Sequence, residues 1–129
     1  MLDLMMDRPL LITDALRYAA TAHGDTEIVS RNIDGSIHRY IYSAAKQRCL
    51  RLSAALQSLG LSQGDRLGSL AWNTHHHFEL FYGVTGQGLV LHTINPRLFR
   101  KAELRDAISA GAYGAVGLPE VAIGATATQ

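Results

Sequence analysis

The sequence has one cysteine, three prolines and no long apolar run. With Cys49 alone, an internal disulfide framework and a cysteine zinc cage are excluded, and a reducing compartment is favoured. No apolar stretch approaches the ~20 residues that a helix needs to span a bilayer. Two acidic residues precede the first basic residue, Arg8, so the start lacks the positive region of a secretory signal. We therefore predict a cytoplasmic protein without a transmembrane segment.

An excess of charge of one sign is also missing. Twelve basic and eleven acidic residues give a net charge of +1, and the basic residues are scattered along the chain. This pattern does not predict a nucleic acid or an anionic membrane as a partner. The length of 129 residues, with 47% hydrophobic and 18% charged residues, is typical of one ordinary globular domain rather than a disordered chain.

The first 42 residues predict a helix followed by a hairpin. Apolar residues recur at three- and four-residue spacing over Pro9–His23, with Pro9 suited to the first helical position and Gly24 to a left-handed residue that ends the helix. Short extended runs at 27–29 and 37–42 flank turn residues and predict two strands. Alternation leaves open which face of the second strand is buried, because its aromatics lie on one face and its isoleucines on the other.

A second amphipathic helix is predicted between Ser43, a suitable N-cap, and Gly60, a suitable residue just past the C-terminus. Its apolar stripe consists of Ala45, Cys49, Leu52, Leu56 and Leu59. Lys46, Arg48 and Arg51 fall mostly off this stripe, so we expect them to face water.

The central part of the chain alternates between strand and helix patterns. Residues 66–72 and 89–94 predict strands, and residues 74–85 between them predict a helix. Short connections of this kind favour a right-handed parallel crossover. We therefore predict an α/β fold, with a partial parallel sheet and flanking helices preceded by a β-hairpin.

The last thirty residues have a different character. Residues 100–110 fit one more helix, whereas residues 111–129 are almost all Gly, Ala, Val and Thr. Residues 114–118 fit one more strand. Beyond Pro119 we expect fraying, because small side chains bury too little surface to offset the entropy of ordering.

Uncommon strings in one collinear order carry a family resemblance over about residues 8–99. The central strings are Leu70-Ala71-Trp72-Asn73-Thr74-His75, Glu79-Leu80-Phe81-Tyr82 and Leu91-His92-Thr93-Ile94-Asn95-Pro96-Arg97-Leu98-Phe99. The upstream strings are Pro9-Leu10-Leu11-Ile12, His23-Gly24-Asp25-Thr26-Glu27-Ile28-Val29-Ser30-Arg31 and Gly64-Asp65-Arg66. Together they resemble the N-terminal portion of an acyl-CoA synthetase (fatty-acid–CoA ligase) of the AMP-binding, adenylate-forming superfamily, particularly the medium- and long-chain ligases.

The resemblance implies a function for the full-length family. Its members activate a fatty acid with ATP to an acyl-adenylate and then transfer the acyl group to coenzyme A, so ATP, Mg²⁺ and CoA are implied. The phosphate loop, the adenine- and ribose-binding motifs and the catalytic lysine of the family lie downstream of the matched region. We find none of them here, so we predict no catalytic residue in this chain and no activity or bound cofactor for it alone.

We interpret residues 1–99, which include the matching strings, as part of the family's large N-terminal domain. The likeness is lost from Arg100, and residues 100–129 are interpreted as a divergent Gly/Ala-rich tail of a truncated or frameshifted reading frame. An alternative function is a non-catalytic interaction module that docks on its own copy as a homodimer or on a full-length paralogue. A small self-sufficient nucleotide binder is a third hypothesis, which lacks a phosphate loop to support it.

Candidate site residues follow from the predicted sheet. Ligands of open α/β sheets lie beyond the carboxyl ends of the strands. These ends carry Trp72, Asn73, Asn95, Pro96 and Arg97, which we interpret as candidates to line an acyl or CoA channel, with Arg97 available to a phosphate. The alternative is structural, with Asn73 and Asn95 capping turns and Pro96 stiffening one.

Three other patterns do not support a site. Consecutive helical residues point about 100° apart, so His75-His76-His77 cannot share one metal ion. Gly83, Gly86 and Gly88 follow a helix and precede a strand, the reverse of the order that aims amides at phosphate. Cys49 lies in an apolar stripe, where burial raises the pKa of a thiol and makes it inert.

Overall fold

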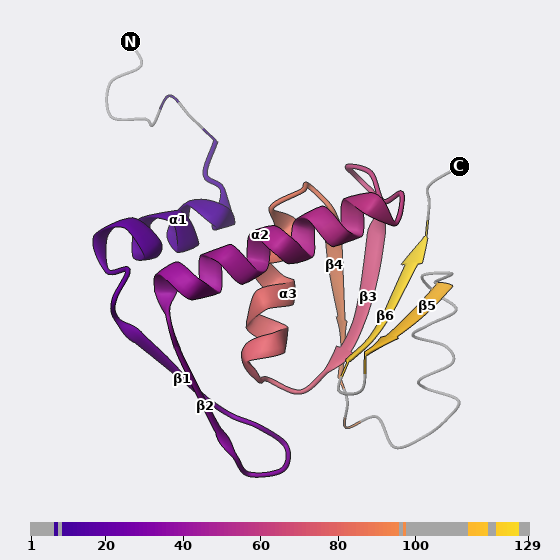
Figure 1. Ribbon diagram of the computed structural model, residues 1–129. Helices are drawn as coiled ribbons and strands as arrows, with labels where there is room; N and C mark the ends of the chain where they lie inside the picture. The colour runs from indigo at the N-terminus through magenta and orange to yellow at the C-terminus, as the bar shows by residue number, and fades with distance from the viewer. Residues whose placement is uncertain (1–6, 8, 96, 98–113, 119–120, 127–129) are drawn as a thin grey trace.

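The computed structural model describes residues 7, 9–95, 97, 114–118 and 121–126. Three helices lie on one side of a four-stranded sheet, and a two-stranded hairpin extends away from them (Figure 1). The helices are α1 (Ile12–Ala22), α2 (Tyr42–Ser58) and α3 (His75–Thr85). The strands are β1 (Glu27–Arg31), β2 (Ile37–Ile41), β3 (Arg66–Ala71), β4 (Val90–Ile94), β5 (Gly114–Leu118) and β6 (Val121–Thr126).

The larger sheet has the strand order β4-β3-β6-β5 and is mixed. β3 and β4 are parallel, with Leu67 opposite Leu91, and α3 forms the connection between them. β6 runs antiparallel to β3, and β5 runs antiparallel to β6. The predicted α/β class and parallel crossover are confirmed, although only the β3–β4 pair of the sheet is parallel.

The core lies between α2, α3 and the sheet. Its buried apolar side chains are Leu56, Leu67, Ala71, Leu80, Val84 and Leu89. The stripe predicted on the second helix supplies Leu56, and the strand predicted at residues 66–72 supplies Leu67 and Ala71. Burial of each large aliphatic side chain contributes about 1.5–3 kcal/mol, so this cluster holds α3 firmly against the β3–β4 pair.

The ends of the first two helices differ from the prediction. α1 begins at Ile12 rather than Pro9, and Gly24 does not adopt the left-handed conformation. Gly24 is instead packed closely, since a Cβ there would lie 2.8 Å from the carbonyl oxygen of Ala20. α2 begins at Tyr42, and its early amides donate to the backbone carbonyls of Thr26 and Gly24 instead of to a Ser43 cap.

Other features of α2 divide between confirmation and correction. Gly60 has φ +86°, which confirms it as the left-handed residue past the helix. Leu59 is 61% exposed, so its place in the apolar stripe was wrong. Arg48 is not simply directed to water, because it pairs with Glu79 of α3. The C-terminal end of a helix tends to fray, and Leu59 lies past the last turn of α2, so its side chain is left in solvent.

The C-terminal strands also test the prediction. β5 spans Gly114–Leu118, as predicted. The expected fraying beyond Pro119 is wrong for Val121–Thr126, which forms β6 between β3 and β5. Backbone pairing explains this, because ladder hydrogen bonds need no large side chain. The helix predicted at 100–110 lies outside the described residues.

The hairpin settles the open question about its faces. His38 and Tyr40 are half-buried, whereas Ile37 and Arg39 are exposed. The aromatic face therefore packs toward the helices. Within the described ranges, no helix combines the length and the apolar character required to cross a bilayer.

Candidate ligand cleft

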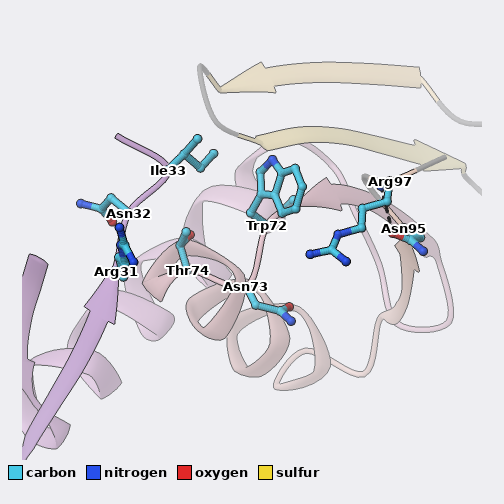
Figure 2. Close-up of a pocket in the computed structure, with 9 residues that line it drawn as sticks. Arg31, Asn32, Ile33, Trp72, Asn73, Thr74, Asn95 and Arg97 are labelled. Carbon is cyan, nitrogen blue, oxygen red and sulfur yellow. Dashed lines mark hydrogen bonds between the residues drawn. The ribbon is translucent and has the colours of Figure 1, made fainter. Parts of the chain in front are cut away.

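A cleft of about 680 Å³ opens where the ends of β3 and β4 meet the tip of the hairpin. Figure 2 shows Trp72 between the hairpin residues on one side and Asn95 with Arg97 on the other. The lining residues are Arg31, Asn32, Ile33, Ala71, Trp72, Asn73, Thr74, Asn95 and Arg97.

Parallel pairing places two segments of this lining at the same sheet edge. Leu70 is opposite Ile94, so the residues that follow β3 and β4 leave the sheet side by side. The first segment continues through Trp72 into α3, and the second continues through Asn95. Such an edge is where ligands of open α/β sheets bind, because the backbone diverges there and leaves a crevice.

The hairpin contributes the third segment. Arg31 ends β1, and Asn32 begins the turn, where the Asn32 N–H donates to the carbonyl oxygen of Ser36 and the Gly35 N–H donates to that of Asn32. Ser30 Oγ accepts a hydrogen bond of 2.8 Å from the backbone N–H of His75, which is the first residue of α3. This contact ties β1 to the start of α3 and fixes Arg31 beside the cleft.

Trp72 and Arg97 form the centre of the cleft. The guanidinium carbon of Arg97 lies 5.9 Å from the centroid of the Trp72 ring, within the range of a cation–π contact. Asn95 Oδ1 accepts a 2.9 Å hydrogen bond from the backbone N–H of Arg97, which fixes the turn that presents this side chain. Trp72 is 42% exposed, so part of its ring remains available for stacking.

The chemistry of the lining favours an anion with a planar group. Two arginines, three asparagines and a threonine line the cleft, and none of the described lining residues is acidic. Arginine matches phosphate or carboxylate oxygens with paired N–H donors. An indole face beside the Arg97 guanidinium, with Arg31 on the hairpin side of the cleft, is suited to stack a heterocycle whose phosphates are paired by the arginines.

Four of the five predicted site residues come together here: Trp72, Asn73, Asn95 and Arg97. Pro96 lies outside the described residues. The structural alternative is correct for Asn95, which caps its turn, whereas the N-cap position of α3 is Thr74 and not Asn73.

The contribution of the hairpin was missed. Arg31, Asn32, Ile33 and Thr74 also line the cleft. Thr74 belongs to the string around Trp72 and could have been included on that ground. No local pattern in the hairpin indicates that its tip lies beside strands formed much later in the sequence.

A cluster of imidazoles lies beneath the hairpin near the cleft. His75 stacks on His38 with ring centroids 3.8 Å apart, and His76 lies 3.9 Å from His75. Burial, followed by the neighbouring His76 and His38, lowers the pKa of His75 to about 4. In the part of the chain that the structure describes, no group of three or more His, Cys, Asp or Glu side chains is arranged to hold a metal ion.

Cys49 lies in the helical core away from the cleft. Its side chain is buried, and burial, with Glu79 as a lesser cause, raises the pKa of the thiol to about 11. The predicted inert, structural thiol is therefore supported by the direction of this shift.

A protein-family model described as AMP-binding enzyme matches residues 16–116. The chain belongs to this family. It is 48% identical over 99 residues to a 3-methylmercaptopropionyl-CoA ligase of Ruegeria lacuscaerulensis, and the match covers 77% of this chain and 18% of that enzyme. It is 41% identical to a medium-chain-fatty-acid–CoA ligase of Ectopseudomonas oleovorans, with the same two coverages.

A solved structure of the AMP-binding family agrees with the fold. The Mycobacterium tuberculosis fatty acyl CoA synthetase superposes with a TM-score of 0.65 at 27% identity, over 78% of this chain and 20% of that one. The resemblance inferred from the sequence strings is thus confirmed. The chain spans about a fifth of the length of the curated relatives it matches.

Proposed function

We propose that this chain forms the N-terminal part of the large domain of a medium- or long-chain fatty-acid–CoA ligase, and that its cleft receives the nucleotide end of coenzyme A. The observation that carries the proposal is the pair Trp72 and Arg97 at the carboxyl ends of β3 and β4, with Arg31 across the cleft. The names of the similar proteins support CoA as the ligand.

The roles of the residues follow from their chemistry. The exposed part of the Trp72 ring stacks on the adenine of CoA, and Arg97 and Arg31 pair with its phosphates. Asn95 holds the turn that presents Arg97. In the complete ligase, the fatty-acid carboxylate attacks the α-phosphorus of ATP and releases pyrophosphate. The CoA thiol then displaces AMP to give the acyl thioester.

We infer that residues 1–99 carry the ligase-like part and that the chain diverges from it within residues 100–129, although the family model matches as far as residue 116. We also infer that these 129 residues do not catalyse adenylation alone, since the phosphate loop and catalytic lysine of such ligases were not found in the sequence. ATP, Mg²⁺ and the fatty acid are assigned to the complete enzyme, which we expect to be cytoplasmic. Release of pyrophosphate from ATP and octanoate by the purified chain would contradict this assignment of inactivity.

The CoA assignment is tested by the fluorescence of Trp72, the single tryptophan. Titration with CoA should quench this emission, and Arg97→Gln should weaken binding by about tenfold, because one charge-assisted phosphate contact contributes about 1.4 kcal/mol. Arg31→Gln should act in the same direction. Dephospho-CoA distinguishes a contact to the 3′-phosphate from one to the diphosphate.

A matched control is available on the same hairpin. Arg39 is exposed, pairs with Glu27 and does not line the cleft, so Arg39→Gln should leave CoA binding unchanged. Equal weakening of CoA binding by Arg39→Gln and Arg97→Gln would mean that the affinity depends on the net charge of the protein and not on a contact in the cleft. An unchanged affinity in both Arg97→Gln and Arg31→Gln would remove the cleft from consideration.

A further inference from the structure

A second pocket, of about 260 Å³, lies between the three helices on a part of the molecule separate from the cleft. Its lining residues are Thr13, Leu16 and Arg17 of α1, Lys46, Cys49, Leu50 and Ser53 of α2, and Tyr82 and Gly86 at the end of α3. None of these nine residues lines the cleft. The pocket and the cleft are therefore two separate sites.

Small residues keep this space open. A Cβ on Gly86 would lie 2.9 Å from the carbonyl oxygen of Tyr82 and 3.4 Å from Cγ2 of Thr13, so a larger residue there would crowd this edge of the pocket. The Ser53 hydroxyl donates a hydrogen bond to the carbonyl oxygen of Gly83. The remaining wall is formed by Leu16, Cys49 and the Tyr82 ring, which gives a mainly apolar interior.

The charged residues of the pocket have one sign. Arg17 and Lys46 line it, and no acidic residue does so among the described residues. Asp14, one turn before Arg17, pairs with that guanidinium at 2.7 Å and offsets part of its charge. Lys46 is half-buried, and no ion pair to it is formed within the described ranges. The ammonium group of Lys46 beside a mainly apolar pocket favours a ligand with an anionic head group and an apolar chain.

The volume limits the size of the ligand. One water molecule occupies roughly 30 Å³ in the liquid, so a pocket of 260 Å³ has the volume of about nine water molecules. This is below the range of pockets for drug-sized molecules, which begins at about 300 Å³. We propose that the pocket binds a short, unbranched aliphatic anion, with Lys46 and Arg17 pairing the head group and the interior receiving the chain. With so few atoms in contact, we expect a Kd on the order of 1 mM.

Cys49 provides a direct reporter of occupancy, because its thiol forms part of the wall. The probe is hexane-1-sulfonate, which remains ionised and cannot be converted to an acyl-adenylate. The 129-residue chain is treated with iodoacetamide at about pH 9, where only a small fraction of a thiol of raised pKa is ionised, so alkylation is slow enough to be followed over hours. Hexane-1-sulfonate should slow alkylation in a saturable manner, whereas n-hexylamine should not.

Variants separate charge from apolar filling. Lys46→Gln should weaken protection by at least about fivefold, whereas Arg51→Gln, a matched loss of charge on the exposed face of the same helix, should leave it unchanged. Arg17→Gln provides a second test if Lys46→Gln does not fold, as judged by its circular dichroism melting curve. Absence of protection, protection equal with n-hexanol, or full protection in both pocket variants would overturn the proposal.

Discussion

Arg48 of α2 donates a hydrogen bond from Nε to Oε1 of Glu79 on α3, over 2.6 Å. The side chain of Glu79 is 9% exposed and that of Arg48 is 40% exposed, so the carboxylate is largely removed from water while the guanidinium reaches its surface. The pair joins two helices across 31 residues of sequence. It also keeps a buried negative charge compensated next to the core.

Arg48→Met should destabilise the fold by about 1–2 kcal/mol, since the apolar stem is kept but the carboxylate loses its partner. This estimate is below that for a fully buried pair, because solvent screens the exposed guanidinium. In a Glu79→Gln background the same change should cost less than about 0.5 kcal/mol. Urea unfolding of the four proteins measures the coupling, and strictly additive effects would contradict it.

His75 should make stability depend on pH between about 4 and 6.5. Burial lowers the pKa of this imidazole to about 4 in the folded protein, so the unfolded chain binds more protons across that window. Stability from this group is therefore complete above pH 6.5 and is lost as the pH falls toward 4. Thermal melts across this range should show the loss.

His75→Phe keeps a ring to stack on His38 and removes the titration, so the slope of stability with pH should become smaller. A residual slope is expected from His77, whose pKa burial also lowers. An unchanged slope in His75→Phe would show that another group causes the loss of stability between pH 6.5 and pH 4.

Gly83→Ala distinguishes packing from helix propensity. Propensity alone predicts that alanine stabilises α3 by about 1 kcal/mol. A Cβ at this position would lie 3.0 Å from Cδ2 of Leu52 and 3.1 Å from the carbonyl oxygen of Cys49. We expect overpacking to prevail, with a net loss of about 1–2 kcal/mol in chemical unfolding.

Leu52→Ala removes the nearest side-chain atoms and should partly relieve the effect of Gly83→Ala, so the double substitution should cost less than the sum of the two. The carbonyl oxygen of Cys49 remains, so relief should be incomplete. A stabilised Gly83→Ala protein would mean that α2 and α3 separate readily.

Ser30→Ala removes the acceptor for the first amide of α3. The hydrogen bond from His75 N–H to Ser30 Oγ replaces a side-chain cap from the helix's own N-cap residue. Loss of such a contact costs about 1 kcal/mol. Amide hydrogen exchange at His75 should also become faster. Ser30→Thr should retain both properties, and Ser58→Ala, at an exposed helix end, should stay within about 0.5 kcal/mol of the unsubstituted protein.

Most elements of this protein could be predicted because their signals are local. The spacing of Leu52 and Leu56 identifies the second helix, and the succession of strand and helix patterns over residues 66–94 identifies β3, α3 and β4. Gly60 marks a helix end because only glycine adopts φ +86° without steric cost. Helix boundaries that depend on distant contacts were missed. α2 begins at Tyr42, whose backbone N–H donates to the carbonyl oxygen of Thr26.

The sequence by itself determined the family, the parallel β3–β4 crossover and the strand ends that carry Trp72, Asn95 and Arg97. Backbone periodicity and turn chemistry act over a few residues, so they can be recognised without coordinates. Tertiary structure alone decided that Arg31 faces the same cleft and that Lys46 faces a helical pocket. It also decided that Arg48 pairs with Glu79. Each of these depends on how elements pack in three dimensions, and no local pattern encodes that packing.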